Sequence, residues 1–262
     1  MSLSRRHFLS AAAAAPFLAG PLVAQERVAM SSGRAASKHA LTPAIRFATA
    51  AQTAAEGLSD YSATLIKRER VNGELKEGRM LLKFRPTPTS VYLKFITPHE
   101  GREVIYVEGR NGGNMLVHET GLASLMGTLK VDPKGSLALK ESRHPVTSIG
   151  MEMMARKVAT QWNVERVLPA PEIKFYPNAT LGKTDCKVVE TTHAVPNELL
   201  KAQRTRLYVA KDTGLPVRVQ QYAFPSRGQK PVLVEDYTYT DVRTNLGMGA
   251  IDFNTKNPNY GF

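Results

Sequence analysis

Hydrophobic and polar residues alternate along residues 61–118, and short turn motifs interrupt the alternation. Met80, Leu82 and Phe84, for example, fall on one face of the predicted strand, and Lys83 and Arg85 fall on the other. Such a period of two places successive side chains on opposite faces of a strand. Asn72-Gly73 is typical of a tight hairpin turn. The stretch therefore predicts an antiparallel meander of five strands with one apolar face and one basic face.

Strand patterns return in the second half of the chain. Asp212-Thr213-Gly214 separates two of these runs and predicts a hairpin there. The predicted strands cover residues 172–176, 187–192, 205–211, 216–224 and 231–240. On the last of them, Tyr237 and Tyr239 share a face. No strand is expected in residues 120–143, which contain several glycines and Pro133.

Two segments have the periodicity of helices instead. Residues 43–58 carry a narrow stripe made mostly of alanine, with Thr42 as the expected N-cap and Pro43 in the first turn. Residues 145–165 place apolar side chains on one face and Glu152, Lys157 and other polar residues on the opposite face. The apolar face consists of Val146, Ile149, Met153, Met154, Val158 and Trp162.

These elements predict an α+β, mainly β fold. About ten antiparallel strands with grouped helices favour an open half-barrel whose concave, apolar face is covered by the helices. A closed barrel would not need such a cover. We expect one domain over residues 42–262, preceded by a small, polar and basic linker over residues 25–41.

The apolar face of the meander and the second helix form the candidate ligand-binding surface. Methionine suits such a surface because its side chain adapts to irregular ligands. The alternative is that the same residues are ordinary core, and only the volume between sheet and helices distinguishes the two. The candidate residues are Tyr61, Leu65, Met80, Leu82, Phe84, Leu93 and Phe95 from the sheet, and Ile149, Met153, Met154 and Trp162 from the helix.

Residues 1–24 have the features of an export signal. Arg5-Arg6 precedes a short, alanine-rich apolar run, and a small-residue cleavage site ends at Ala24. The order of these features matches the twin-arginine export pattern, and an ordinary secretory signal is the alternative. The apolar run is shorter than the ~20 residues of a membrane-spanning helix. We therefore expect a periplasmic, soluble mature protein.

The charge and the chemical motifs limit the possible partners. The chain has a formal net charge of +12, and an exported protein of this kind is expected to meet anionic membrane surfaces or acidic proteins, not nucleic acid. Its single cysteine, Cys186, excludes an intrachain disulfide. No metal-binding, nucleophile or phosphate-binding motif is present, so no metal, cofactor or enzymatic activity is expected. Glu103 and His118 are the weak enzymatic candidates.

Three segments resemble an uncharacterised bacterial family defined only as a domain of unknown function. They are the run from DYSATLIKRERV to NMLVHE, the segment LKVDPKGSLALKESRHPVTSIGM and the ending NPNYGF. The resemblance extends over residues 45–262, and the family is distantly similar to the LolA/LolB lipoprotein-carrier and RseB-like superfamily. That similarity implies an open half-barrel that binds acyl chains or lipidated partners on its concave face, with no catalytic residues.

Two functions follow from these features. The first is an exported protein that holds a lipid, an acyl chain or another hydrophobic molecule in the half-barrel. The second is an RseB-like envelope sensor that contacts an acidic protein through the basic face of the sheet. That basic face would consist of Lys67, Arg68, Lys83, Arg85 and Lys94.

Overall fold

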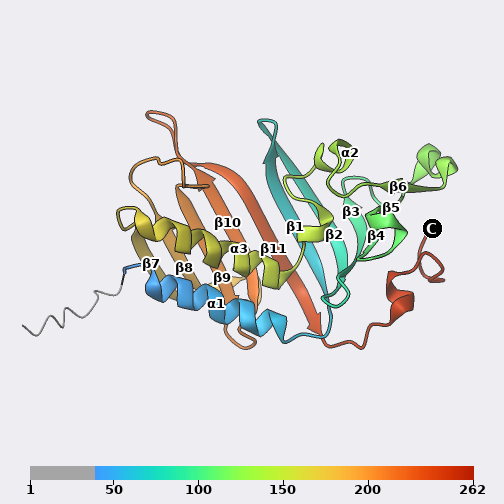
Figure 1. Cartoon of the computed structure of the whole chain (residues 1–262), viewed down its shortest axis with the longest axis horizontal. Helices are drawn as coiled ribbons and strands as arrows, with labels where there is room; N and C mark the ends of the chain where they lie inside the picture. The colour runs from blue at the N-terminus through green and yellow to red at the C-terminus, as the bar shows by residue number, and fades with distance from the viewer. Residues whose placement is uncertain (1–38) are drawn as a thin grey trace, which may run out of the picture. The chain divides into compact units, whose positions relative to one another are not determined.

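One antiparallel sheet of eleven strands organises the computed structural model, which describes residues 39–262 (Figure 1). The strand order is β6-β5-β4-β3-β2-β1-β11-β10-β9-β8-β7, so the first and last strands pair at the centre. The strands are β1 (Tyr61–Val71), β2 (Glu74–Arg85), β3 (Ser90–Thr97), β4 (Glu103–Val107), β5 (Met115–His118), β6 (Thr128–Val131), β7 (Glu172–Leu181), β8 (Thr184–Thr192), β9 (Arg204–Ala210), β10 (Pro216–Ala223) and β11 (Val232–Thr244).

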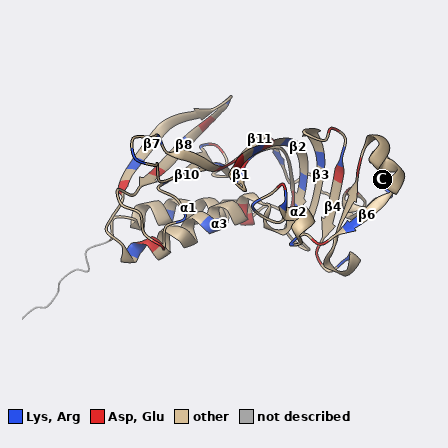
Figure 2. Ribbon diagram, turned by 90° about the horizontal axis from the view of Figure 1, so that it is seen from above, with Lys and Arg blue, Asp and Glu red and all other residues tan. Residues whose placement is uncertain are grey.

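Three α-helices lie on the same face of this sheet (Figure 2). They are α1 (Thr42–Glu56), α2 (Ser136–Leu139) and α3 (Met151–Val164). The sheet does not close, because β6 and β7 are its two edges. The predicted fold class, a mainly β open antiparallel sheet with helices on one face, is thus confirmed. The predicted export signal and most of the predicted linker lie outside the described residues.

Two predicted elements need correction. Residues 128–131 form a strand, β6, in a stretch expected to have none, because they pair with β5 and extend the meander by one strand. The second helix begins at Met151 and not at residue 145. Gly150 has a φ of 145°, outside the helical region, and only the short 3-10 turn Val146–Ser148 precedes it.

The first helix agrees with its prediction within two residues at each end. Its N-cap position is Leu41, so Thr42 is the first helical residue and not the cap, while a proline occupies the first turn as expected. The alanine stripe is buried: Ala44, Ala48, Ala51 and Ala55 are at most 4% exposed. Such small side chains let α1 pack closely against α3 and β10.

The C-terminal segment packs on the opposite, convex face of the sheet, beside β3–β5 (Figure 1). Tyr260 stacks on Tyr92 with ring centroids 3.9 Å apart. Phe253, in the 3-10 turn Ala250–Phe253, is buried against the same cluster. The amide of Gly261 donates a hydrogen bond of 2.8 Å to Glu103 Oε2. The tail therefore covers the convex face of the meander.

Candidate functional site

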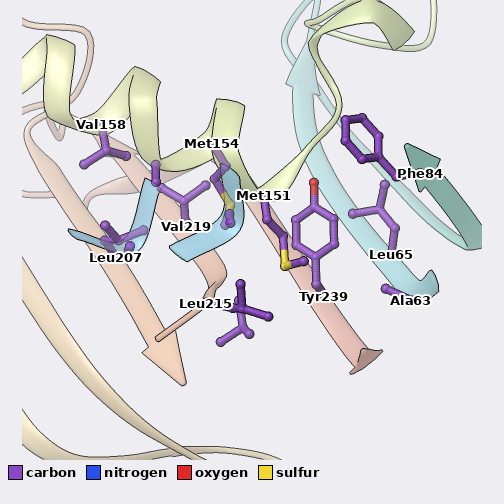
Figure 3. Close-up of a cluster of buried hydrophobic side chains, with 14 of the residues drawn as sticks. Ala63, Leu65, Phe84, Met151, Met154, Val158, Leu207, Leu215, Val219 and Tyr239 are labelled. Atoms are coloured by element: carbon purple, nitrogen blue, oxygen red, sulfur yellow. The ribbon is translucent and has the colours of Figure 1, made fainter. Parts of the chain in front are cut away.

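The concave face of the sheet has two halves that differ in how they are covered. Over β8–β10, helices α1 and α3 fill the space with side chains; we call this the filled half. Trp162 of α3 is fully buried there, and its Nε1 donates a hydrogen bond of 3.0 Å to Thr191 Oγ1 on β8. Val158 of the same helix faces Leu207 across the interface, and Met154 faces Val219 (Figure 3). Met154, Val158 and Val219 lie at the edge of the filled half and also border the cavity described below.

Aromatic side chains stand at the centre of the sheet, between the two halves. The ring of Tyr61 lies 5.1 Å from that of Phe84 and 6.4 Å from that of Tyr239, centroid to centroid. The Tyr61 hydroxyl accepts a 3.0 Å hydrogen bond from the backbone amide of Met151. This bond satisfies one of the free amides at the start of α3 and ties the helix to β1. Burial raises the pKa of the Tyr61 and Tyr239 hydroxyls above the ordinary value.

The other half, over β2–β6, contains a cavity of about 550 Å³ and is called here the hollow half. Its cover is not a long helix but the segment 137–150, which includes most of α2 and the 3-10 turn before α3. The sheet contributes an apolar floor made of Met80, Leu93, Phe95, Val104, Met115, Val117, Leu129 and Val131. The cover contributes Leu137, Ala138, Pro145, Val146 and Ile149, and α3 contributes Met154 and Val158.

Five of the predicted ligand-binding residues line this cavity: Met80, Leu93, Phe95, Ile149 and Met154. The other six do not. Met153 is partly exposed on α3. The remaining five, Tyr61, Leu65, Leu82, Phe84 and Trp162, are at most 1% exposed. Because these five are close-packed with the aromatic centre or the filled half, the alternative interpretation as core holds for them.

One end of the cavity is polar, and there the cover segment contacts strands β1 and β11. Glu69 on β1 is fully buried and lies 2.9 Å from Lys67 Nζ. It also accepts hydrogen bonds from the hydroxyls of Ser142, at 3.3 Å, and Tyr237. Burial and the Glu69 carboxylate raise the pKa of the Tyr237 hydroxyl. This network fixes the cover segment to β1 and β11.

A second carboxylate, Glu235 on β11, lines the same end. Its Oε2 lies 2.9 Å from His144 Nε2 and 3.5 Å from Arg143 Nε, both in the cover. Burial alone would raise the pKa of Glu235, but the hydrogen bond and charge of His144 and the charge of Arg143 outweigh it, so the pKa is below the ordinary value. Lys157 of α3 and Gln221 of β10 complete what we call the polar end.

The opposite rim of the cavity is held by contacts between charged and polar side chains. Arg102 lies 2.8 Å from Glu119 and 3.3 Å from Glu141, and His99 lies 3.5 Å from Glu141. Glu141 belongs to the cover, whereas Arg102 and Glu119 flank the ends of β4 and β5. These half-exposed pairs join the cover to the meander, and each contributes little stability by itself.

The polar end includes residues that sequence reasoning misplaced. Lys67 was assigned to the basic outer face, yet its parity along β1 is that of Tyr61 and Leu65, and it lines the cavity. Extending the alternation of β1 by four residues beyond Leu65 would have placed Lys67 and Glu69 inside. Lys157 is exposed on the polar face of α3, as predicted, and it also lines the cavity because the hollow half begins at that edge of the helix.

The basic outer face is also less available than predicted. Lys83 Nζ lies 2.7 Å from Asp252 of the C-terminal tail, and Lys94 Nζ lies 3.0 Å from Glu103. The guanidinium of Arg85 lies over the ring of Phe253, 5.0 Å from its centroid. The tail therefore covers or neutralises Lys83 and Arg85, and Glu103 of β4 neutralises Lys94, although all three were expected to face solvent or a partner. Arg68 is paired with Glu77 at 2.9 Å.

The apolar residues before β6 take no part in the cavity. Leu122, Leu125 and Met126 lie in the 3-10 segment Gly121–Met126 and are 68–88% exposed. Within residues 39–262, no group of three or more His, Cys, Asp or Glu side chains is placed to hold a metal ion. The same part of the chain has no helix that is long and apolar enough to cross a membrane.

The fold and cavity describe an open half-barrel with a lined interior, and sequence comparison gives its family. The chain belongs to the family described as "Protein of unknown function (DUF1571)", whose model matches residues 58–262. This match confirms the resemblance to an uncharacterised bacterial family. A search of the curated proteins found no match.

Several solved structures resemble the chain at a distance. Lipoprotein LppX of Mycobacterium tuberculosis has 13% identity and a TM-score of 0.46, covering 79% of this chain and 98% of that chain. MucB in the Pseudomonas aeruginosa MucA/MucB complex has 14% identity and a TM-score of 0.45, covering 81% and 60%. A LolA superfamily protein of Nitrosomonas europaea has 10% identity and a TM-score of 0.33, covering 80% and 96%. Because these likenesses are weak, the function has to be argued from the cavity.

Proposed function

We propose that this protein binds a lipid, an acyl chain or a similar hydrophobic molecule in the cavity of its hollow half. The observation that carries the proposal is the volume of about 550 Å³ between an apolar floor and a thin cover. Pockets for small molecules are typically ~300–1,000 Å³ and mostly apolar, with a few polar groups that orient the ligand. The cavity has this composition, because its polar residues gather at the rim and at the polar end.

The energetics of a single acyl chain are compatible with this role. Burial of one methylene contributes ~0.8 kcal/mol, so a chain of ~16 carbons gains on the order of 12 kcal/mol before other terms. Loss of translational and rotational freedom on association costs roughly 4–15 kcal/mol. When the cost is at the low end of this range, the net free energy of binding is about −8 kcal/mol, which corresponds to micromolar affinity. Binding of this strength requires that the cavity accept the chain without repacking the filled half.

The cover segment 137–150 is the natural route for the ligand. It has few regular hydrogen bonds beyond the single turn of α2 and the 3-10 turn, and side-chain contacts join it to the sheet. Segments held mainly by such contacts open at lower free energy than helices or central strands. We infer that the cover moves to admit the ligand while α1 and α3 stay in place.

The proposed setting is the periplasm, after export directed by residues 1–24. Support comes from the paired arginines and the cleavage site ending at Ala24. Replacing both arginines by lysine (Arg5→Lys and Arg6→Lys) tests the route. Loss of the protein from the periplasmic fraction of its host is expected, and unchanged fractionation would contradict twin-arginine export.

A fluorescent fatty acid whose emission rises in apolar surroundings tests the binding itself. The mature protein is expected to bind this probe with micromolar affinity. Ala138→Trp on α2 places a large side chain in the cavity and should weaken probe binding at least about tenfold. Ser136→Trp, on the same helix but outside this cavity, is the matched control and should bind as the parent does. The proposal fails if the parent does not bind the probe, or if both tryptophan variants bind equally well.

A further inference from the structure

One cation at the polar end of the cavity has no anion of its own. Lys157 lies on α3 one turn after Met154, and both residues line the cavity. Among the described side chains, the Lys157 ammonium forms neither an ion pair nor a hydrogen bond. Gln221, which lines the same end from β10, likewise has no side-chain hydrogen bond in that part of the chain.

The two carboxylates near Lys157 already have cationic partners. Glu69 is paired with Lys67 at 2.9 Å, and Glu235 is paired with Arg143 at 3.5 Å. Lys67, Arg143 and Lys157 therefore bring three positive charges against two negative ones, even with His144 neutral. The polar end is left with one positive charge in excess, beside an apolar cavity.

The surroundings of Lys157 favour an added anion. Lys157 is exposed at the opening of the cavity. Partial desolvation of its ammonium lowers its pKa from the ordinary value; the charges of Glu235 and Glu69 oppose this effect, and the charge of Lys201 adds to it. A cation that loses hydration without gaining a counter-ion is destabilised, and a neighbouring anion restores the interaction. The charge-assisted hydrogen bond that results is stronger than one between neutral groups.

We propose that the polar end binds the negatively charged head, carboxylate or phosphate, of a single-chain amphiphile whose tail lies in the hollow half. This inference rests on the proposed function and names the class of ligand. Lys157 contacts the head directly, and the amide of Gln221 donates a second hydrogen bond. A neutral head leaves the lysine without a partner, and a cationic head is repelled by it.

Displacement of the fluorescent fatty acid by four competitors with sixteen-carbon chains tests the inference. They are palmitate, hexadecyl phosphate, monopalmitoylglycerol and hexadecyltrimethylammonium, each kept below its micelle concentration at low salt. The first two are expected to compete at least about tenfold better than the neutral glycerol ester, and the cation should be the weakest. Added salt should reduce the advantage of the anions.

Lys157→Gln is expected to weaken palmitate and hexadecyl phosphate about tenfold while leaving monopalmitoylglycerol unchanged. Arg156→Gln is the matched control, because Arg156 is exposed, pairs with Glu56 and does not line the cavity. Equal competition by all four amphiphiles in the parent would overturn the inference and leave the proposed function intact. Persistence of the anion preference in Lys157→Gln would overturn the role of Lys157. Failure of every competitor and of the probe would remove both proposals.

Discussion

The filled half and the hollow half share one sheet and one strand pattern, yet only the hollow half has room for a ligand. In the filled half, two helices of 15 and 14 residues pack on the strands with alanine and tryptophan side chains. In the hollow half, a four-residue helix and irregular chain span a similar sheet surface. The comparison indicates that the apolar strand faces are equivalent and that the length of the covering elements determines where the interior is filled.

A matched pair of leucines tests this difference with the largest expected effect. Leu207 on β9 is fully buried in the filled half, whereas Leu93 on β3 lines the cavity at 5% exposure. Leu207→Ala creates a new void and should reduce the free energy of unfolding by about 3–5 kcal/mol. Leu93→Ala only enlarges a void that exists and should cost about 1–2 kcal/mol. Urea unfolding measures both, and equal losses would show that the two halves are packed alike.

A second prediction concerns the start of α3, where the two halves meet. Burial raises the pKa of Glu152 to about 7, from an ordinary value of 4.5. Because the folded state then binds the proton more tightly than the unfolded state, this group destabilises the fold as the pH rises from about 4.5 to about 7. Glu152→Gln should therefore stabilise the protein at pH 8 by roughly 1–2 kcal/mol. The full pKa shift, at ~1.4 kcal/mol per pKa unit, would give a larger gain, but the side chain is partly exposed and solvent screens its charge.

Thermal unfolding of Glu152→Gln at pH 5 and pH 8 checks the sign. The gain should be present at pH 8 and nearly absent at pH 5, where the native Glu152 carboxyl is protonated. Glu198→Gln, at an exposed position, is the control and should change little at either pH. A variant less stable than the parent at pH 8 would contradict this account of Glu152.

The smallest expected effect concerns the convex face of the hollow half, which the C-terminal tail supports. Tyr260→Ala removes the stack on Tyr92 and should cost about 1 kcal/mol. Amide hydrogen exchange in β3 and β4 should become faster, while exchange in β8 and β9 stays the same. Tyr260→Phe keeps the stack and loses only the 2.6 Å hydrogen bond to the Asp252 carbonyl, so its exchange should lie nearer the parent. Faster exchange in both halves would mean that the tail does not act locally.

The sequence predicted the sheet well because alternation reports burial directly. Met80, Leu82 and Phe84 face the interior as their spacing indicated. The cover was predicted less well, since residues 145–150 continue an apolar helical pattern that Gly150 interrupts. A helix of full length there would have filled the hollow half. The position of this break depends on the backbone and the packing of Met151 under Tyr61, which periodicity does not report.

The candidate site was predictable in part for the same reason. Residues on the strands that line the cavity, such as Leu93 and Phe95, have the parity that the sequence assigns. Leu65 and Leu82 have the same parity and are core, because they pack in the buried cluster that contains the aromatic centre. Parity identifies the face of a strand, whereas the elements across from it decide between core and cavity. Lys67 contacts Ser142 and Glu69 contacts Tyr237. These partners are distant in the sequence, so the local pattern around Lys67 and Glu69 does not predict the contacts.

The most direct test of the central claim is to label the site with a palmitate analogue that carries a photoreactive diazirine at the end of its chain. After irradiation of the complex, mass spectrometry of peptides locates the adducts. We expect adducts on β2–β6 and on the cover segment 137–150, and their loss in Ala138→Trp. Adducts concentrated on α1, β8 or β9 would contradict the assignment of the ligand to the hollow half.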